Sequence, residues 1–449
     1  MKRCGEDAKE PFMWPYFPEL LETPVPRYTS FPTAAEFTSA VGADDLDAAL
    51  RGVSGDVSLY VHIPFCEKIC WYCGCNTSAA NRRERLASYL DALHRDIAIT
   101  GVRLDGRVQV RRVAFGGGSP NAIAPTDFVR LVDALTLHVA LEDPVWSIEI
   151  DPRTLTEEWG QVLSFVGVQR ASMGVHTFAP HLQERIGRVQ PDAMIERGTD
   201  LLRRAGVSSL NFDLMYGLPG QTMDDLESSL ARTVELGADR IALFGYAHVP
   251  HMIPRQRRID ATALPEQAER FAMAARGYEF LTAAGYLPVG FDHFAEPGDP
   301  MGVAAREGRV HRNFQGFTDD AAPALVGVGA SAISCFPDVL VQNEKNAGRY
   351  RMLLSQDRLS GVAGIVRSAA DRELGAIITA LLCQGEARVG KDRLAGMACM
   401  LHPFVTRGVA EVDGDTLRIP PRGLPYARTI AALFDPYRQD SLRRFSSAV

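Results

Sequence analysis

The chain has 449 residues, of which 46% are hydrophobic and 23% charged, the balance of an ordinary soluble globular protein large enough for more than one domain. Its net charge of −7 argues against nucleic acid as the main partner, because a phosphate-binding surface needs an excess of basic residues. No stretch approaches the roughly 20 apolar residues of a membrane span, and the first residues lack the apolar core of a secretory signal, so we expect a cytoplasmic protein.

The N-terminal segment differs from the rest of the chain by its prolines, which recur from Pro11 to Pro32 and interrupt regular structure. We therefore expect residues 1–50 to form an extended arm that packs on the core.

Short apolar runs then alternate with segments that are mostly long enough for crossover helices, and this alternation indicates a parallel sheet. In the first of these segments, from Leu86 to Ile97, apolar residues recur at helical spacing. The pattern is compatible with an open doubly wound sheet and with a partial (β/α) barrel. The expected strands cover residues 57–63, 112–115, 147–150, 171–175, 210–216, 241–246 and 287–291.

The alternation ends after about residue 360. Residues 371–383 favour a helix, and residues 409–419 favour a small hairpin that turns at Asp413-Gly-Asp. We therefore expect a domain of residues 51–360 that contains the sheet, followed by a smaller, mainly helical C-terminal domain of residues 361–449.

Four cysteines lie close together just past the end of the first expected strand, where α/β folds place their active sites. Thiolates this close can converge on one metal centre, and soft sulfur selects zinc, copper or an iron–sulfur cluster. Structural zinc sites usually take two cysteine pairs a dozen or more residues apart. A tight Cys-x3-Cys-x2-Cys run can instead offer three ligands to a [4Fe–4S] cluster and leave one iron open. We favour this over a zinc protein, and over a disulfide, since nothing suggests secretion. The four are Cys66, Cys70, Cys73 and Cys75.

Further polar residues mark the ends of the following strands. The glycines of Gly116-Gly-Gly-Ser-Pro120 either bring exposed backbone amides close to a ligand or form a tight turn. Glu149 and Asp213 each face the side opposite their apolar neighbours, which in a barrel is the interior. There they would bind a polar ligand or form a structural ion pair. His176 ends the strand between them, as a ligand contact or a structural residue.

These motifs resemble those of the radical S-adenosylmethionine (SAM) superfamily and, within it, those of the oxygen-independent coproporphyrinogen III oxidase family. The superfamily signature is the triad Cys66, Cys70 and Cys73, and the narrower signature adds Cys75 in Cys-Gly-Cys-Asn. The resemblance runs from about residue 20 to the C-terminal end. The other matching segments are residues 26–33, 60–65, 116–120, 211–219, 292–295 and 311–317.

The resemblance implies an α/β fold with a partial (β/α) barrel of radical SAM type, in which the triad holds a [4Fe–4S] cluster that binds SAM through its open iron. Tyr60 and Cys75 belong to the catalytic site, although Cys75 is not expected to be a cluster ligand and its role stays open. The family can hold a second SAM molecule, for which the matching residues are Phe314, Gln315 and Ile333. The residues implied in binding the first SAM are Tyr60, Gly117, Gly118, Ser119, Glu149, His176, Arg188 and Asp213.

One position departs from the family pattern. Where this chain has Val175-His-Thr-Phe178, the family commonly has Val-Gln-Asp-Phe. A histidine at position 176 can still donate a hydrogen bond to a ribose hydroxyl, but it can also titrate.

The resemblance implies a radical SAM oxidoreductase of haem biosynthesis that decarboxylates two propionates of coproporphyrinogen III to vinyl groups, giving protoporphyrinogen IX. The reaction also requires an electron donor and an electron acceptor, which the sequence does not identify. We expect Arg27, Arg255 and Arg312 as candidates for binding the substrate carboxylates, and the arm around Arg27 to act on substrate handling rather than on folding. Two alternatives stay open: an enzyme that methylates or degrades haem anaerobically, with which His176 would be consistent, and a haem-binding chaperone.

Overall fold

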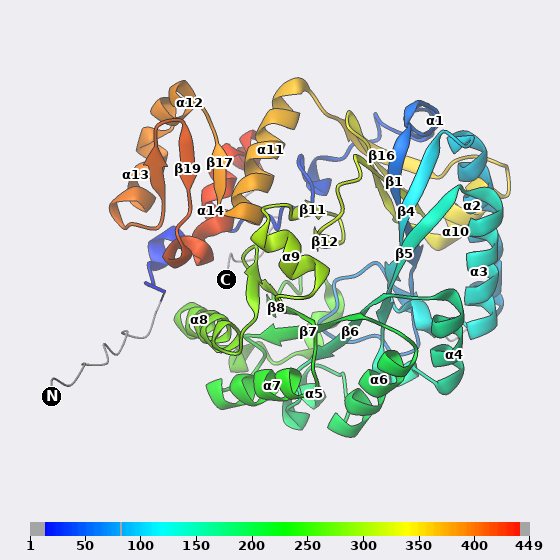
Figure 1. The fold of residues 1–449 in the computed structure, drawn as a ribbon, viewed down its shortest axis with the longest axis horizontal. Helices are drawn as coiled ribbons and strands as arrows, with labels where there is room; N and C mark the ends of the chain where they lie inside the picture. Colours follow the sequence, from blue (N-terminus) through cyan, green and yellow to red (C-terminus); the bar gives the residue numbers. More distant parts are fainter. Residues whose placement is uncertain (1–13, 81–82, 441–449) are drawn as a thin grey trace, which may run out of the picture.

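In the computed structural model, described for residues 14–80 and 83–440, one sheet of 12 strands organises most of the chain (Figure 1). Its strand order is β16-β15-β14-β13-β1-β4-β5-β6-β7-β8-β10-β9. Neighbouring strands from β1 to β8 are parallel, and they coincide with the first six expected strands. They are β1 (Gly55–Ile63), β4 (Val108–Gly117), β5 (Leu141–Ile150), β6 (Arg170–His176), β7 (Ser209–Tyr216) and β8 (Arg240–Gly245).

The crossover helices lie on one face of this sheet. Neighbouring helices contact each other: α2 packs against α3, α3 against α4, and α4 against α6. The helices therefore form an outer layer. Figure 1 shows the strands curving inside this layer, which makes the fold a partial (β/α) barrel and not a doubly wound sheet. The helices of the layer are α2 (Arg83–Leu104), α3 (Pro125–His138), α4 (Glu157–Val166), α5 (Pro180–Arg185), α6 (Asp192–Arg204), α7 (Met223–Glu235) and α8 (Gln267–Ala283).

The two faces of the sheet differ in polarity because side chains alternate along each strand. On β1, Val57, Leu59 and Val61 are at most 1% exposed and belong to the main apolar core. The inner face instead carries charges that need partners. Arg112 and Arg170 both bind the Asp319 carboxylate, each at 2.7 Å, so three strand and loop segments are tied together inside the barrel.

The seventh expected strand forms, but the prediction that it extends the parallel sheet is wrong. β9 (Leu287–Val289) is antiparallel to β10 (His293–Ala295), which is itself antiparallel to β8. The connection between β9 and β10 is too short for a crossover helix, and only an antiparallel pair can be joined so tightly.

At the opposite edge, β13 (Ala324–Val328) is parallel to β1, and three antiparallel strands follow it: β14 (Ile333–Cys335), β15 (Val339–Asn343) and β16 (Gly361–Val366). The large sheet therefore continues to Val366, slightly beyond residue 360. The smaller elements attached to the barrel are α1 (Ala43–Gly52), β2 (Phe65–Cys66), β3 (Ser78–Ala79), α9 (Pro300–Arg306), β11 (His311–Asn313), β12 (Gly316–Thr318) and α10 (Ala347–Leu354).

The chain after β16 folds into a smaller, mainly helical unit. The helix expected at 371–383 is α11 (Ala369–Gln384), and the hairpin expected at 409–419 is formed by β18 (Glu411–Asp413) and β19 (Thr416–Arg418). β17 (Glu386–Arg388) adds a third strand to that hairpin. The remaining helices of the unit are α12 (Lys391–Gly396), α13 (Ala398–Thr406) and α14 (Ala427–Ala431).

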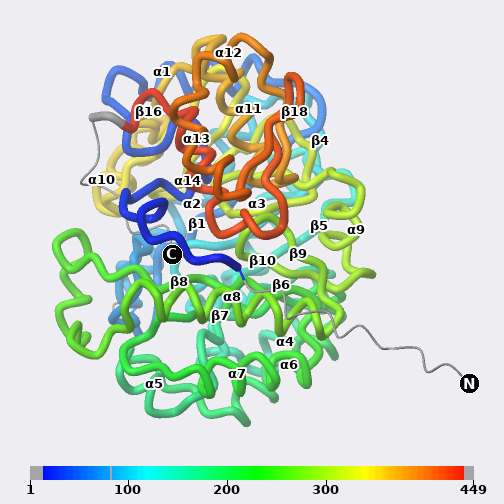
Figure 2. Tube along the Cα trace, turned by 90° about the vertical axis from the view of Figure 1, so that its left-hand side faces the viewer, coloured from blue at the N-terminus to red at the C-terminus, as the bar shows by residue number. Residues whose placement is uncertain are grey.

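The described part of the arm runs between the C-terminal unit and the barrel, as Figure 2 shows for the dark blue tube between α14 and α8. The described part of the arm is extended as far as residue 42, apart from single turns at Pro18–Leu20 and Ala34–Glu36. The expectation of an extended arm is wrong for residues 43–50, which belong to the helix α1. Trp14 donates a hydrogen bond to the Pro421 carbonyl (3.1 Å), and Tyr28 donates one to Asp435 (2.9 Å). Residues 1–13 lie outside the described part of the chain.

The arm is also part of the main apolar core, which differs from the expectation that it acts on substrate handling and not on folding. Trp14 packs against the rings of Phe271 and Tyr278 on α8. The buried arm residues of this core are Trp14, Leu20, Leu21, Val25, Tyr28 and Phe31.

Candidate active site

The cysteine loop begins where β1 ends, and two backbone hydrogen bonds fold it back onto that strand end. The Ser78 amide donates to the Pro64 carbonyl (2.8 Å), and the Ala80 amide donates to the Cys66 carbonyl (2.9 Å). All four cysteines of the loop line one cavity at the carboxyl ends of β1, β4, β5 and β6. Among the residues that the structure describes, no group of three or more His, Cys, Asp or Glu side chains is close enough to hold a single metal ion. The thiols are instead distributed around the shared cavity.

Guanidinium groups surround these thiols. Arg188 donates to Cys70 Sγ (3.2 Å), and Arg153 lies 3.5 Å from the same sulfur. Burial raises the pKa of Cys66 to about 11, whereas hydrogen bonds from Cys75, assisted by Arg255 and Arg188, lower the pKa of Cys73 to about 6. Thiolates are the metal-binding form of cysteine, and positive surroundings favour them. Soft thiolates in an electropositive cavity fit an iron–sulfur cluster as ligands.

Arg188 is held rigidly beneath the cysteine loop. It donates to the Gly174 carbonyl (2.6 Å) and to Gln190 Oε1 (3.0 Å), and it lies 3.4 Å from Asp151. Arg153 pairs with the same carboxylate at 2.6 Å. Burial on its own would raise the pKa of Asp151, but the two guanidinium groups lower it below its usual range. A ligand carboxylate bound by Arg188 would therefore share that arginine with Asp151.

The glycine turn at the end of β4 contributes mainly to packing, because its backbone amides bond to other groups of the protein. Gly117 donates its amide to Glu149 Oε2 (3.0 Å), and the Gly118 and Ser119 amides donate to carbonyls of Ile63 and Phe65. The expectation that these amides are exposed is therefore wrong. Gly117 has a φ of +117°, and a Cβ there would lie 2.5 Å from the His62 ring. A Cβ on Gly118 would lie 2.5 Å from the Phe65 carbonyl oxygen. The glycines let β4 lie directly against the strand end that carries the cysteines.

Glu149 and Asp213 face the barrel interior from β5 and β7. Asp213 accepts hydrogen bonds from Ser172 (3.1 Å) and Asn211 (2.8 Å). Burial raises the pKa of both carboxyls; the neighbouring Asp213 adds to the effect at Glu149, whose pKa is about 7. Within residues 14–80 and 83–440 neither carboxylate forms an ion pair with a Lys or Arg side chain. The structural-ion-pair interpretation therefore fails for both acids, and their oxygens remain available to a ligand.

His176 ends β6 with a φ of +67°, in the left-handed region that non-glycine residues rarely adopt. Its ring packs edge-on against Tyr72, with 5.1 Å between centroids, and its Nδ1 is buried without a hydrogen-bond partner. Burial and then Arg188 hold the pKa of His176 well below 6.5. We therefore expect a neutral imidazole at neutral pH, with one polar atom free for a ligand.

The other residues singled out in the sequence lie farther along the barrel interior. Tyr60 lies on β1 and bonds His62 Nδ1 at 3.0 Å, while Cys75 lines both the cysteine cavity and the adjoining interior cavity. Gln315, in the turn between β11 and β12 together with Phe314, lines the same interior cavity as Cys75. Ile333 is the first residue of β14. This strand pairs with β13, and β13 in turn pairs with β1, where Gly327 lies opposite Tyr60.

The three candidate arginines are dispersed. Arg255 lies near Cys73, where it favours the thiolate, and its Nη1 is buried without a partner. Arg312 stacks on Phe317 (4.3 Å to the ring centroid) and donates to arm carbonyls, so it positions the arm. Arg27 lines a separate pocket together with two arginines that the sequence analysis did not select, Arg270 and Arg428. No sequence signal marks these two, since neither belongs to a motif and they lie on helices far apart in the chain.

A partial barrel with a Cys-x3-Cys-x2-Cys loop at the end of its first strand defines a radical SAM protein, and residues 60–232 match the Radical SAM superfamily. A protein of Paracoccus denitrificans named oxygen-independent coproporphyrinogen III oxidase is 39% identical over 432 residues, covering 93% of this chain and 95% of its own. One with the same name from Bradyrhizobium diazoefficiens is 37% identical over 440 residues, covering 95% and 98%.

The solved structure of coproporphyrinogen III oxidase from Escherichia coli, described as a radical SAM enzyme, superposes with a TM-score of 0.87 at 34% identity. It covers 92% of this chain and 97% of its own. The chain therefore belongs to the oxygen-independent coproporphyrinogen III oxidase family. These names do not favour the haem-modifying enzyme or the haem chaperone. In the described part of the chain, no helix is long and apolar enough to cross a membrane.

Proposed function

We propose that this protein is a radical SAM oxidoreductase that decarboxylates two propionates of coproporphyrinogen III to vinyl groups, giving protoporphyrinogen IX in haem biosynthesis without oxygen. The relatives and the solved structure support the activity through their names and through near-complete coverage. The single observation that carries the proposal for the site is the cavity that Cys66, Cys70 and Cys73 share with the unpaired carboxylate of Glu149.

Cys66, Cys70 and Cys73 would hold a [4Fe–4S] cluster, and SAM would bind beside it. When both are bound, electron transfer from the cluster to SAM supplies a 5′-deoxyadenosyl radical, whose chemistry belongs to the cofactors. Arg188 and Arg153 contact the Cys70 sulfur, and Arg188 would also offer a positive charge to the carboxylate of SAM.

The inner strand faces would orient the rest of SAM. Glu149 and Asp213 offer carboxylate oxygens to hydroxyl and amino groups, and carboxylates accept stronger hydrogen bonds than amides do. His176 would use its unpartnered ring nitrogen for a ribose hydroxyl. The turn at Gly117, Gly118 and Ser119 would border the methionine part of SAM through its backbone.

The reaction itself would take place in the interior cavity beside the cysteine cavity. Cys75 lines both cavities and Tyr60 lies next to Gly116 near Glu149 and Cys75, and these two are the proposed catalytic contacts. A second SAM would bind near Phe314, Gln315 and Ile333. We further propose that the protein works in the cytoplasm, with an electron donor and an electron acceptor still to be identified. We also propose three parts of the chain: an arm (1–50), a radical SAM domain (51–360) and a C-terminal domain (361–449).

The test is an anaerobic assay of the cluster-reconstituted protein with SAM, dithionite and coproporphyrinogen III, to which anaerobic bacterial cell extract is added as the source of the electron acceptor. We expect protoporphyrinogen IX, measured after oxidation as protoporphyrin, together with 5′-deoxyadenosine. Cys70→Ser should abolish both products, whereas Cys399→Ser, at an exposed position on α13, should leave both unchanged. Production of 5′-deoxyadenosine without any decarboxylated product under these conditions would refute the substrate assignment.

A further inference from the structure

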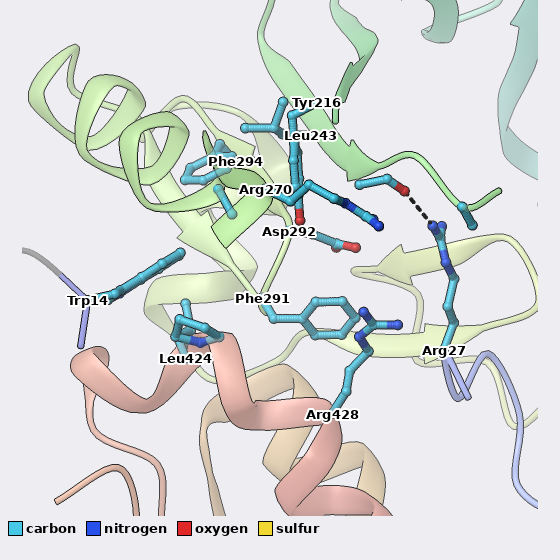
Figure 3. A pocket seen from close by; sticks show the side chains of 14 residues that line it. Trp14, Arg27, Tyr216, Leu243, Arg270, Phe291, Asp292, Phe294, Leu424 and Arg428 are labelled. Carbon is cyan, nitrogen blue, oxygen red and sulfur yellow. Dashed lines mark hydrogen bonds between the residues drawn. The ribbon is translucent and has the colours of Figure 1, made fainter. Parts of the chain in front are cut away.

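A second pocket lies where the arm, the carboxyl end of β8 and the C-terminal unit meet (Figure 3). Three arginines line it from separate elements: Arg27 from the arm, Arg270 from α8 and Arg428 from α14. Figure 3 shows all three side chains extending into the space beside Asp292, which follows β9. The rest of the lining is largely apolar and aromatic, with Trp14, Phe291 and Phe294 among its rings.

Arg27 is exposed and Arg270 and Arg428 are half-buried, and all three lack a carboxylate partner among the described residues. Arg27 donates only a long bond to the Gly245 carbonyl (3.4 Å), and Arg270 donates to the Tyr246 carbonyl (2.8 Å) while its Nε stays buried and unpartnered. Arg428 lies 5.6 Å from the Phe291 ring centroid. Across residues 14–80 and 83–440, none of the three forms an ion pair with a carboxylate, because Asp292 bonds His293 instead (2.6 Å).

The arrangement is unfavourable for the protein without a ligand. Burial and then the proximity of Arg27 lower the pKa of Arg428 to about 10, and burial likewise lowers that of Arg270. Unpaired charges cost free energy in a buried site, and planar guanidinium groups bind carboxylates in pairs of parallel hydrogen bonds. Three guanidinium groups of the pocket face one carboxylate, and Arg312 adds a fourth positive charge beside it, so at least two further carboxylates would be needed to balance the charge.

The pocket adjoins the interior cavity that contains the proposed reaction site. Phe294 lines both this pocket and the interior cavity. The interior cavity in turn shares Cys75, Glu149 and Asp213 with the cysteine cavity. The three spaces therefore follow one another, with the arginines at the end away from the cysteines.

We propose that Arg27, Arg270 and Arg428 bind the two propionate carboxylates of the substrate that the reaction leaves unchanged. This proposal rests on the proposed function, and it explains how a propionate on another ring is presented to the radical at the cysteine end. Because the arm supplies Arg27, and Arg312 holds the arm carbonyls of Arg27 and Tyr28, substrate binding and arm position are coupled.

The test compares two stable porphyrins on the reconstituted holoenzyme. Coproporphyrin III has four carboxylates, whereas protoporphyrin IX keeps only the two that the reaction spares. Arg270→Gln and Arg428→Gln should each weaken binding of both porphyrins by about tenfold to a hundredfold, because each removes a charge-assisted hydrogen bond. Arg197→Gln, at an exposed position on the outer helix α6, is the matched control and should leave both affinities unchanged. Affinity is read from the change in porphyrin fluorescence.

Further readouts separate ligand binding from folding. Iron content and SAM affinity of Arg428→Gln should equal those of the parent, and its thermal unfolding midpoint should be equal or higher, because Arg428 forms no ion pair with any residue that the structure describes and its charge is only a cost without a ligand. Should the glutamine variants misfold, Arg428→Lys and Arg27→Gln provide the same comparison. Parent-like affinity of folded variants for both porphyrins would overturn the proposal. Loss of affinity for coproporphyrin III alone would overturn the assignment to the unchanged propionates. Failure of the parent to convert coproporphyrinogen III would refute the proposed function, whatever the arginine variants bind.

Discussion

Glu149→Gln is expected to have two opposite effects: it should stabilise the protein without SAM at alkaline pH, and it should weaken SAM binding. Burial in the barrel and the nearby Asp213 raise the pKa of Glu149 from 4.5 to about 7. An acid whose pKa is higher in the folded state is penalised once it ionises there. The parent therefore loses this part of its stability as the pH rises from about 4.5 to about 7.

The size of the stability effect follows from the shift and from the surroundings. At about 1.4 kcal/mol per pKa unit the full shift is worth at most about 3 kcal/mol. The Glu149 side chain is open to the cavity, so water screens the charge, and we expect a gain of about 1 kcal/mol. Glutamine keeps an oxygen for the Gly117 amide, which donates at 3.0 Å, so the turn should survive the exchange.

SAM binding should respond in the other direction. The ribose hydroxyls would lose a carboxylate acceptor, which costs about 1–3 kcal/mol of binding free energy. In the parent, SAM affinity should rise as Glu149 ionises around pH 7, whereas the affinity of the variant should be flat across that range.

Two measurements on the reconstituted protein check this reasoning. Chemical denaturation at pH 5.5 and pH 8.5 compares the free energy of unfolding, and equilibrium dialysis from pH 6 to pH 8.5 compares SAM affinity. Glu158→Gln, exposed on the outer helix α4, is the matched control and should change neither quantity. Parent-like SAM affinity of Glu149→Gln, or a stability difference that is the same at both pH values, would refute the reasoning.

Three further changes probe the cluster loop, the barrel interior and the arm. Serine at Cys66, Cys70 or Cys73 should abolish iron binding while Cys75→Ser should not, and a triad variant with full iron content would contradict the ligand assignment. Asp319→Ala should destabilise the protein by about 3 kcal/mol in chemical denaturation, because it removes the salt bridge of the half-buried Arg170 and leaves Arg112 only Asp320, 3.6 Å away; a loss below about 1 kcal/mol would argue against this ion pair as a major support. Trp14→Ala should cost about 3 kcal/mol and expose the arm to limited proteolysis, and an unchanged digestion pattern would show that Trp14 does not anchor the arm.

The parallel strands could be predicted from the sequence because each is a short apolar run bounded by a connection of helical length. The same reasoning failed at residues 287–291, where the apolar run is real but its partner is set by the short turn to β10. The choice of a barrel could not be made from the pattern, because periodicity fixes which face of each helix is buried but not which face of the sheet it covers.

For the site, strand alternation correctly predicted that Glu149 and Asp213 face inward. It could not separate Glu149 from Asp151, since both lie at the carboxyl end of the same strand. Arg153 pairs with Asp151 within one local turn, but only the fold brings Arg188 to Asp151 and leaves Glu149 unpaired. The arginine pocket was out of reach for the same reason: Arg27, Arg270 and Arg428 come from segments far apart in the chain, and nothing local marks them as a group.

The charged groups of the interior fall into two classes. Those in ion pairs stabilise the fold, and those without a partner are available to bind a ligand. Asp319 and Asp151 are paired with arginines, which lower the pKa of each carboxyl, so these groups favour folding. Four groups have no ion-pair partner among the described residues: Glu149, Asp213, Arg270 and Arg428. Burial raises the pKa of the two acids and lowers that of the two arginines, so it favours the uncharged form of each. Each unpaired group therefore makes the ligand-free protein less stable than it could be. Because ligands of opposite polarity would relieve that penalty, the unpaired acids fit the hydroxyl and amino groups of SAM, and the unpaired arginines fit the carboxylates of a tetrapyrrole.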